Sequence, residues 1–484
     1  MSTERTTMPR LVPSPAVLVG LIAAAVLIGV TIAKGVQDAD YFWHVTAGQL
    51  ILDGGVPSTD PFSFTWQGQP WTPHEWLSEV VIYALVATTG VTGALIAFGL
   101  IVGAIPLIHS VGLGAIGMRT TAIAAAAAIS VPVFFPYVTV RPQAISWLLM
   151  TVLIWLLLSL RPDRPRRLIA IPVLFALWAN LHGLYVVGFG FIGLYALFTL
   201  AGRTPMAPRR WWVVGACVAA AAASMLTPAG PEGLLYPLRY IDAGDWGLAN
   251  IQEWQSPDFH NPAHWPLLIL VIALIANGGR AAPGWLTALS WVAVAMALVS
   301  LRNAPIAALV AMPALAYGLS SRLAPARALS PRLGRRRRVM EVALAGVMIV
   351  ASLVILVPRD PAAASAGAVA GRYPVASLDL LVERSPDARV LADYGWGGYA
   401  INRLYPSGGR VFIDGRNDMY GDDILDDYST VRAAEEGWET ILDRHEVTAL
   451  LFPPGAPIVR GHAQDAGWCE ALRDDVQVLL LRDC

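Results

Sequence analysis

The sequence is poor in charged residues and contains almost no lysine. Only 14% of its 484 residues are charged, against roughly a quarter in soluble globular proteins, and 56% are hydrophobic. Lys34 is the single lysine, so every other permanent side-chain cation is an arginine. A mean hydropathy of +0.55 places the chain among membrane proteins. The net charge of -1 excludes a polybasic nucleic-acid-binding protein.

Other missing features narrow the class of membrane protein. No small-residue cleavage site follows Thr31 and Ile32, so we expect the first apolar run to be a retained span rather than a signal peptide. The sequence shows no inverted repeat, and no predicted span carries an ionisable residue near its middle. Secondary transporters usually have inverted repeats and ionisable residues near the middle of the membrane. A transporter or lipid flippase is therefore the alternative function, and a non-enzymatic scaffold is a third.

Apolar runs that approach the length of a bilayer span recur along the first 357 residues. About eleven of them predict a mostly α-helical, polytopic transmembrane bundle. Two of the runs, 264–277 and 303–319, are short for a span. The runs fall at 15–33, 91–111, 120–138, 142–160, 168–182, 183–201, 211–227, 264–277, 283–300, 303–319 and 339–357.

Basic residues are distributed unevenly between the two sides of this predicted bundle. With the N-terminus inside, the cytoplasmic segments hold eighteen cations and the outer loops hold four. Because positively charged loops stay in the cytoplasm, this bias predicts a multi-pass cell-membrane protein with a cytoplasmic N-terminus. An odd number of spans then places the C-terminal tail outside. The four outer cations are Lys34, Arg141, Arg239 and Arg302.

The chain is expected to have two parts. Residues 1–357 form the transmembrane unit, with a long first outer loop at 34–80, and a linker at 358–371 precedes an extracytoplasmic domain at 372–484. In that domain, strands predicted at 389–392, 410–414, 448–452 and 476–481 alternate with helices predicted at 398–404, 423–445 and 458–472. This order indicates a small parallel or mixed α/β domain. Cys469 and Cys484 lie there, where a disulfide is chemically permitted.

Two carboxylates stand at the start of the first outer loop. Asp38 and Asp40 lie just past the first span, in the run Q-D-A-D-Y-F-W-H that ends at His44. Two such groups can bind a cation, or raise the pKa of one of them so that it acts as a general base. The structural alternative is that Asp40 caps a helix from Tyr41 to Leu52. Capping accounts for one aspartate but not for both.

A second helix of the loop is predicted to begin at Thr72-Pro73-His74-Glu75. Thr72 as N-cap, Pro73 at the first helical position and Glu75 after it make a capping box. His74 is then an exposed first-turn residue, unless it lines a site above the bundle. Four tryptophans of the loop suit either a membrane-interface belt or platforms for sugar rings: Trp43, Trp66, Trp71 and Trp76.

More polar residues gather at the outer ends of the predicted spans. Each by itself fits a helix cap or a contact with a lipid headgroup. All of them share one side of the membrane, where arginines, histidines and carboxylates at one level suit an anionic headgroup that meets a base. These residues are Arg141, Asn180, His182, Glu253 and Arg302.

Short motifs are spread over nearly the whole chain. They are D-A-D-Y-F-W-H, T-D-P-F-S-F-T, P-H-E-W-L, V-R-P-Q, N-L-H-G, N-I-Q-E-W-Q-S-P-D-F and F-I-D-G-R-N-D-M-Y-G-D. In them the sequence resembles the bacterial GT-C glycosyltransferases, related in architecture to protein O-mannosyltransferases and aminoarabinose transferases. The small α/β tail departs from the carbohydrate-binding β-sandwich of several GT-C enzymes. Its polar residues either meet the acceptor or pack the tail onto the rest: Asp393, Trp396, Asp414, Arg416, Asp418 and Tyr420.

The resemblance implies a reaction and a set of roles. A sugar moves, with inversion, from a polyprenyl-phosphate donor to a hydroxyl of a glycan, lipid or protein acceptor outside the membrane. Asp40 is expected to act as base, with Asp38 as its electrostatic or metal-binding neighbour; the resemblance leaves a divalent cation open. Arg302 and Arg141 are expected to bind the donor phosphate. The cavity residues are expected to be His44, His74, Glu75, Asn180, His182 and Glu253.

Overall fold

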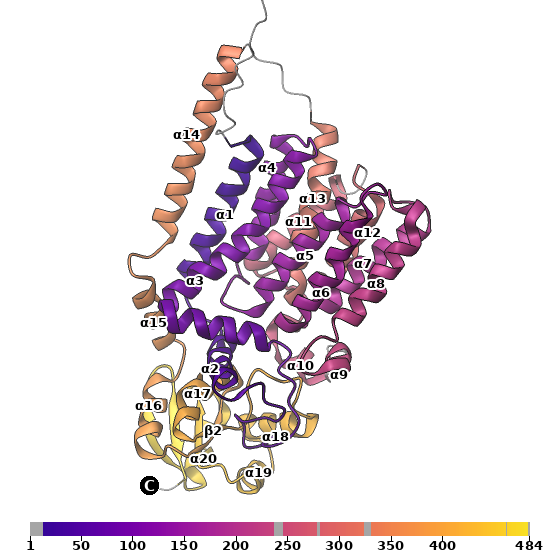
Figure 1. Cartoon of the computed structure of the whole chain (residues 1–484). Helices are drawn as coiled ribbons and strands as arrows, with labels where there is room; N and C mark the ends of the chain where they lie inside the picture. The colour runs from indigo at the N-terminus through magenta and orange to yellow at the C-terminus, as the bar shows by residue number, and fades with distance from the viewer. Residues whose placement is uncertain (1–12, 237–244, 278–280, 324–330, 461, 483–484) are drawn as a thin grey trace, which may run out of the picture. The chain divides into compact units, whose positions relative to one another are not determined.

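The computed structural model describes residues 13–236, 245–277, 281–323, 331–460 and 462–482. A helix lies at each of the eleven predicted apolar runs, so the mostly helical fold is confirmed (Figure 1). Four helices of the described part are long and apolar enough to cross a membrane: Pro15–Lys34, Trp76–Ala115, Leu301–Arg322 and Arg336–Leu356. The shorter helices leave the count of eleven spans a prediction.

By internal contacts the chain divides into two compact units. The first comprises residues up to Val30, Gly99–Val138 and Ser256–Val357. Within it, α13 packs against α4, α11 and α12 and is buried on all sides from Ala304 to Ala316, as expected for a helix that is apolar all round. The helices of this unit are α1 (Pro15–Lys34), the later part of α3 (Trp76–Ala115), α4 (Thr120–Ser130), α11 (Trp265–Asn277), α12 (Gly284–Val299), α13 (Ala304–Arg322) and α14 (Pro331–Leu356).

Helix α14 gives the clearest sign of a membrane environment. Its candidate span, Arg336–Leu356, has a mean hydropathy of 2.5, yet only 6% of that window is buried. Large side chains such as Leu344, Val354 and Ile355 are more than half exposed. A single apolar helix with so much uncovered surface fits lipid rather than water.

The second unit comprises Thr31–Phe98, Thr139–Gln255 and Pro358–Cys484. Its helices before the tail are α2 (Ala39–Gly54), the first part of α3, α5 (Pro142–Leu158), α6 (Ala170–Leu181), α7 (Tyr185–Leu200), α8 (Arg210–Ala223), α9 (Gly230–Leu235) and α10 (Asp245–Asn250). Helix α6 packs against α5 and α8, and α7 packs against α8. Gly90, with φ 67° and ψ −177°, interrupts α3 and separates a first helix from the predicted span that begins at residue 91.

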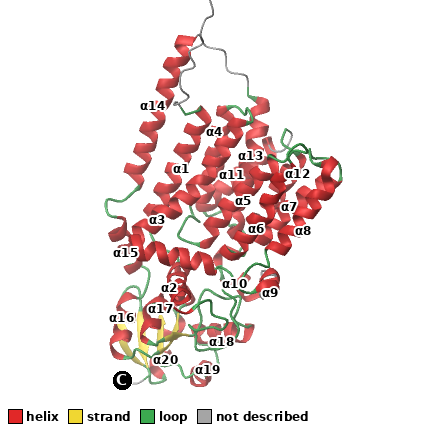
Figure 2. Cartoon of the chain, in the orientation of Figure 1, coloured by secondary structure: helices red, strands yellow, loops and turns green. Residues whose placement is uncertain are grey.

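The tail forms a five-stranded mixed sheet in the order β2-β1-β3-β5-β4 (Figure 2). Strands β1 and β2 are parallel, β1 and β3 are parallel, and β5 runs antiparallel to β3 and β4. A strand lies at each of the four predicted positions, but the strand expected at 410–414 is only the two residues Arg410–Val411. The elements are α15 (Pro361–Ala370), α16 (Val375–Arg384), β1 (Arg389–Ala392), α17 (Gly397–Leu404), β2 (Arg410–Val411), α18 (Asp422–Ala433), α19 (Trp438–Arg444), β3 (Ala449–Phe452), α20 (His462–Asp465), β4 (Cys469–Arg473) and β5 (Val478–Leu481).

Two predicted tail helices are wrong. The helix expected at 423–445 is two helices, α18 and α19, because Ala434 and Gly437 between them adopt positive φ values of 55° and 91°. The helix expected at 458–472 reduces to the single turn α20, and its end is the edge strand β4. Cys469 begins that strand and is disulfide-bonded, whereas Cys484 lies outside the described residues.

The first outer loop adds to the free edge of this sheet. Ser63 pairs in parallel with Val411 of β2, and the backbone amide of Phe64 donates to the Val411 carbonyl at 3.0 Å. The loop thus covers an edge that would otherwise expose unpaired backbone groups. The segment interpreted as a linker is itself ordered, because α15 fills it and Ser365 Oγ accepts a hydrogen bond from the Val36 amide at 3.0 Å.

Candidate active site

Helix α2 begins at Ala39, two residues earlier than predicted, and this changes the roles of the two aspartates. Asp38 is the N-cap, and its Oδ1 accepts a hydrogen bond from the Asp40 amide at 3.0 Å. The capping role considered for Asp40 therefore belongs to Asp38. The Asp40 carboxylate lies in the first turn and is free for contacts with side chains.

Arg141 joins this pair from the start of α5. It precedes Pro142 and is extended, with φ −138° and ψ 147°, as the residue before a proline usually is. Its guanidinium contacts Asp40 Oδ2, and its Nη1 lies 3.2 Å from Asp38 Oδ2 and 3.1 Å from Glu253 Oε2. All four side chains are between 15% and 29% exposed, so the cluster is largely buried but open to solvent at one side.

Three carboxylates around one guanidinium carry an excess of negative charge. Burial raises the pKa of Asp38, Arg141 opposes this rise, and the charges of Asp40 and Glu253 add to it. The site therefore favours the uptake of a proton or of a further positive charge. A general base must take up a proton, so this environment suits one.

Asp40 is also held by groups on both sides of it. Trp43 Nε1 donates to Asp40 Oδ1 at 3.2 Å. On the tail side, a Cβ added to Gly415 would lie 2.2 Å from the same oxygen, so a larger residue there would have to displace the Asp40 carboxylate. The loop after β2 thus closes over the carboxylate, and Trp43 acts as a hydrogen-bond donor rather than as a free platform for a sugar.

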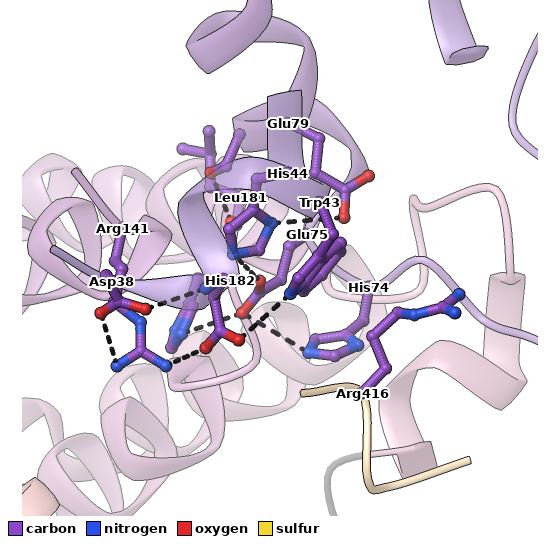
Figure 3. Close-up of polar contacts among 12 residues, drawn as sticks. Asp38, Trp43, His44, His74, Glu75, Glu79, Arg141, Leu181, His182 and Arg416 are labelled. Carbon is purple, nitrogen blue, oxygen red and sulfur yellow. Dashed lines mark hydrogen bonds and ion pairs between the residues drawn. The ribbon is translucent and has the colours of Figure 1, made fainter. Parts of the chain in front are cut away.

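A second polar cluster lies one turn further along α2 (Figure 3). Glu75 is at its centre, with Oε1 3.0 Å from His182 Nε2 and 3.6 Å from His74 Nε2. Its Oε2 is 3.5 Å from His44 Nε2. Glu79 completes the group, with Oε1 3.7 Å from His44 Nδ1. Three imidazoles therefore surround two buried glutamates.

The charges of this cluster support one another. Burial disfavours the carboxylate of Glu75, but the surrounding histidines, His182 foremost, lower its pKa. Burial likewise disfavours the charged form of His74, yet its interaction with Glu75 raises the pKa of His74 to about 9. The Leu184 amide lies 3.1 Å from His182 Nδ1, which leaves His182 Nε2 to face Glu75 Oε1 at 3.0 Å.

The start of α3 corrects the capping box. The helix begins at Trp76, and Glu75 precedes it with an 11% exposed side chain instead of reaching back to cap the helix. Trp76 Nε1 donates to Asn180 Oδ1 at 2.9 Å, which ties this turn to the end of α6. His74 is not the exposed residue of the capping interpretation but stacks on Tyr236, with ring centroids 5.0 Å apart.

A cavity of about 420 Å³ opens beside His74. Trp71, Trp76 and Tyr185 provide aromatic surface, and Glu232 adds a carboxylate. Its size and its mixture of rings and polar groups suit a small polar ligand such as a sugar. The other lining residues are Val56, Pro57, Ser58, Pro70, Thr72, Pro73, Ala179, Thr227, Pro228, Ala229 and Gly233.

The structure thus brings nine of the ten predicted site residues into one compact unit. Asp38, Asp40, Arg141 and Glu253 meet directly, as do His44, His74, Glu75 and His182, and Asn180 reaches them through Trp76. Arg302 lies in the short 3₁₀ helix Leu301–Asn303 of the other unit, and its phosphate role stays a prediction. Glu79 was missed.

The tail residues Arg416, Asp414 and Tyr420 pack rather than point outward. Arg416 is 2% exposed and lies 2.7 Å from Asp60 Oδ1 of the first outer loop and 2.6 Å from Asp414 Oδ2. Tyr420 donates to the same Asp414 oxygen at 2.6 Å. Asp60, which lies in the T-D-P-F-S-F-T motif but had no predicted role, therefore anchors the outer loop to the tail.

No protein-family model and no curated protein matches the chain. The similarity to known proteins is therefore one of fold. One similar structure is arabinofuranosyltransferase AftD from Mycobacteria, with a TM-score of 0.54, 16% identity and coverage of 96% of this chain. This similarity shows that the chain shares the fold of the matched part of AftD. It spans 41% of the length of AftD. ArnT from Cupriavidus metallidurans bound to undecaprenyl phosphate is also similar, with a TM-score of 0.49, 14% identity and coverage of 95% of this chain and 96% of that one.

Proposed function

We propose that this protein is a membrane glycosyltransferase that moves a sugar from a polyprenyl-phosphate donor to an acceptor hydroxyl on the outer face of the membrane. The observation that carries the proposal is the Asp40 carboxylate, paired with Arg141, hydrogen-bonded by Trp43 and still 19% exposed. Because folds host many functions, the GT-C fold is compatible with this reaction, and the site residues supply the specific support.

The proposed reaction is a single displacement. The acceptor hydroxyl transfers its proton to Asp40 while its oxygen attacks the anomeric carbon of the sugar. The bond between that carbon and the phosphate oxygen breaks, and polyprenyl phosphate leaves with the bonding electrons. Attack opposite the leaving group inverts the configuration. Asp38 and Glu253 keep the surroundings negative, which favours proton uptake by a carboxylate.

Arg141 has a positioning role in this proposal, because its guanidinium is already engaged by three carboxylates. It fixes the orientation of Asp40 and balances part of the negative charge. A contact between Arg141 and the donor phosphate would have to replace one of these ion pairs. Arg302 therefore remains the first candidate for the donor phosphate.

The test is transfer of a labelled sugar from a polyprenyl-phosphate donor in proteoliposomes. Asp40→Asn keeps the shape of the side chain but cannot take the proton, so kcat should fall by about 10²–10⁴. Asp258→Asn, at a carboxylate that is 64% exposed and paired only locally with His260, is the matched control and should leave kcat unchanged. Near wild-type turnover in Asp40→Asn would refute the base role. Donor movement across the bilayer without transfer would favour a flippase instead.

A further inference from the structure

His44, Glu75 and Glu79 form a buried group of metal-ligating side chains apart from the Asp40 site. One ligand atom from each lies within 4.8 Å of the others. His44 comes from α2, Glu75 from the turn before α3, and Glu79 from the first turn of α3. The side chains of His44 and Glu79 are 2% and 0% exposed.

Several ligand atoms of this group lack hydrogen-bond partners. Within the described residues, neither carboxylate oxygen of Glu79 has one, and His44 Nδ1 has none either. An isolated buried charge costs several kcal/mol, so a buried carboxylate without hydrogen bonds either takes up a proton or binds a cation. Glu79 lies in the first turn of α3, in the helix that precedes the break at Gly90, and its side chain is fully buried.

The three side chains lie near one another, but His44 is too far from both glutamates for direct hydrogen bonds. His44 Nε2 lies 3.5 Å from Glu75 Oε2 and His44 Nδ1 lies 3.7 Å from Glu79 Oε1, whereas a charge-assisted hydrogen bond is about 2.7–2.9 Å long. One ion can bind only one of these two ring nitrogens. Two ligand atoms that each bind one tetrahedral zinc at about 2.0–2.1 Å lie roughly 3.3 Å apart. One ligand atom from each residue lies within 4.8 Å of the others, so side-chain rotations must shorten these separations by up to roughly 1.5 Å to place the three groups on one ion.

We propose that His44, Glu75 and Glu79 bind a first-row divalent transition-metal ion. Imidazole with two carboxylates suits zinc or manganese better than magnesium or calcium, which prefer oxygen ligands alone. His182 is the outer partner, because its Nε2 lies 3.0 Å from Glu75 Oε1 and orients that carboxylate while Oε2 faces His44. The Asp38–Asp40 pair is the weaker cation site, since Arg141 already supplies a positive charge there.

The ion would join α2 to the start of α3. His44 lies one helical turn after Asp40, so this link would fix the part of α2 that carries the acidic pair. The expected role is structural, and it can be tested without an activity assay.

Zinc is the probe, and the full-length protein in detergent is the sample. Wild-type protein should retain one zinc per chain after gel filtration, measured by elemental analysis. A chelator should lower its Tm by about 5 °C or more, and added Zn²⁺ but not Mg²⁺ should restore it. A wild-type Tm that responds to neither chelator nor zinc, in protein that holds no metal, would overturn the proposal whatever the variants do.

The variants locate the ion. Glu79→Gln and His44→Gln should purify without zinc and with a Tm that the chelator leaves unchanged. Asp38→Asn should retain zinc, as should the control His445→Gln, whose imidazole pairs with Asp427 in the tail. Loss of zinc in Asp38→Asn with retention in Glu79→Gln would move the ion to the acidic pair and refute this site.

Discussion

Arg141 is the residue on which the candidate active site depends. Its guanidinium is the one side chain that reaches Asp38, Asp40 and Glu253 together among the described residues. A planar fork with several donors can hold three carboxylates at fixed angles, whereas an ammonium group cannot. The chemistry of Asp40 is therefore expected to respond to changes at Arg141 that leave its own carboxylate intact.

Arg141→Lys tests this dependence. Lysine keeps the charge but loses the fork, so kcat should fall about tenfold or more with little change in the donor KM. Arg141→Gln removes the positive charge that contacts both aspartates, so the acid limb of kcat/KM should move to higher pH. A raised donor KM at unchanged kcat in either variant would instead identify Arg141 as a phosphate ligand.

The chemical identity of most site residues could be predicted because polar groups at the ends of apolar runs are rare. Their partners could not be predicted, since the contact between Arg141 and Asp40 joins residues 101 positions apart. Glu79 was missed because it fits the capping helix as an ordinary polar residue. A glutamate directly before a long apolar run was the available signal.

At the scale of elements, α2 is held between α3 and the tail. Helix α17 packs on α2 (Figure 1), where Asn402 Nδ2 donates to Thr46 Oγ1 at 3.0 Å. A Cβ at Gly398 would lie 2.2 Å from the Ala39 carbonyl oxygen. Together with Gly415 on Asp40, this close approach makes the tail part of the structure that positions the acidic pair.

Gly415→Ala should therefore damage catalysis more than folding. The added methyl group must displace the Asp40 carboxylate from Arg141 and Trp43, and a shift of about 1 Å can cost roughly 100-fold in rate. The control is Gly421→Ala in the same stretch, because nothing lies within 4 Å of its Cβ and its φ is −75°. Transfer kinetics and Tm of both variants check this, and equal activity of the two would contradict it.

The contact between the outer loop and the tail sheet depends on Asp60. Burial alone would raise its pKa, but the charge of Arg416 and hydrogen bonds from Ser63 and Phe62 lower it. A carboxyl group whose pKa is lower in the folded state stabilises the fold fully above its unfolded value, about 3.9, and loses this contribution as the pH falls through the folded pKa.

Asp60→Asn should lower the free energy of unfolding by about 1.5–3 kcal/mol at pH 7. The difference from wild type should stay constant down to about pH 5 and shrink below pH 4, as Asp60 of the wild type takes up its proton. Denaturant unfolding followed by tryptophan fluorescence measures both. Asp379→Asn, in a half-exposed pair with Arg403, is the control and should have little effect. A pH-independent difference would exclude the ion pair as the cause.

Element types in the tail could be predicted where the hydrophobic period was clear, as in the buried strand Ala449–Phe452. The prediction failed at 458–472, where a strand at the sheet edge has three exposed side chains in five residues and lacks an apolar face. It also failed at the junction of α18 and α19, because the left-handed turn at Ala434 has no glycine to mark it.

At the scale of the whole molecule, the contact between the first outer loop and the tail restricts the orientation of the chain in the membrane. Pairing of Ser63 with Val411 requires the first outer loop and the tail to lie on one side of the membrane. An acceptor that meets Asp40 must come from that same side. The charge distribution of the sequence predicts that this side is the outside, and the residues between α5 and α6 should then lie inside.

Cysteine labelling tests this orientation. In a Cys217→Ser background, Gln67→Cys and Gly395→Cys should react with an impermeant maleimide on intact cells, because both positions are exposed and lie in the outer loop and the tail. Asp163→Cys, exposed between α5 and α6, should react only after permeabilisation. Cys469 is disulfide-bonded and should not contribute to the signal. Labelling of Gly395→Cys only after permeabilisation would mean that the number of spans is even. Labelling of Gln67→Cys and Gly395→Cys from opposite sides would contradict the pairing of the outer loop with the sheet.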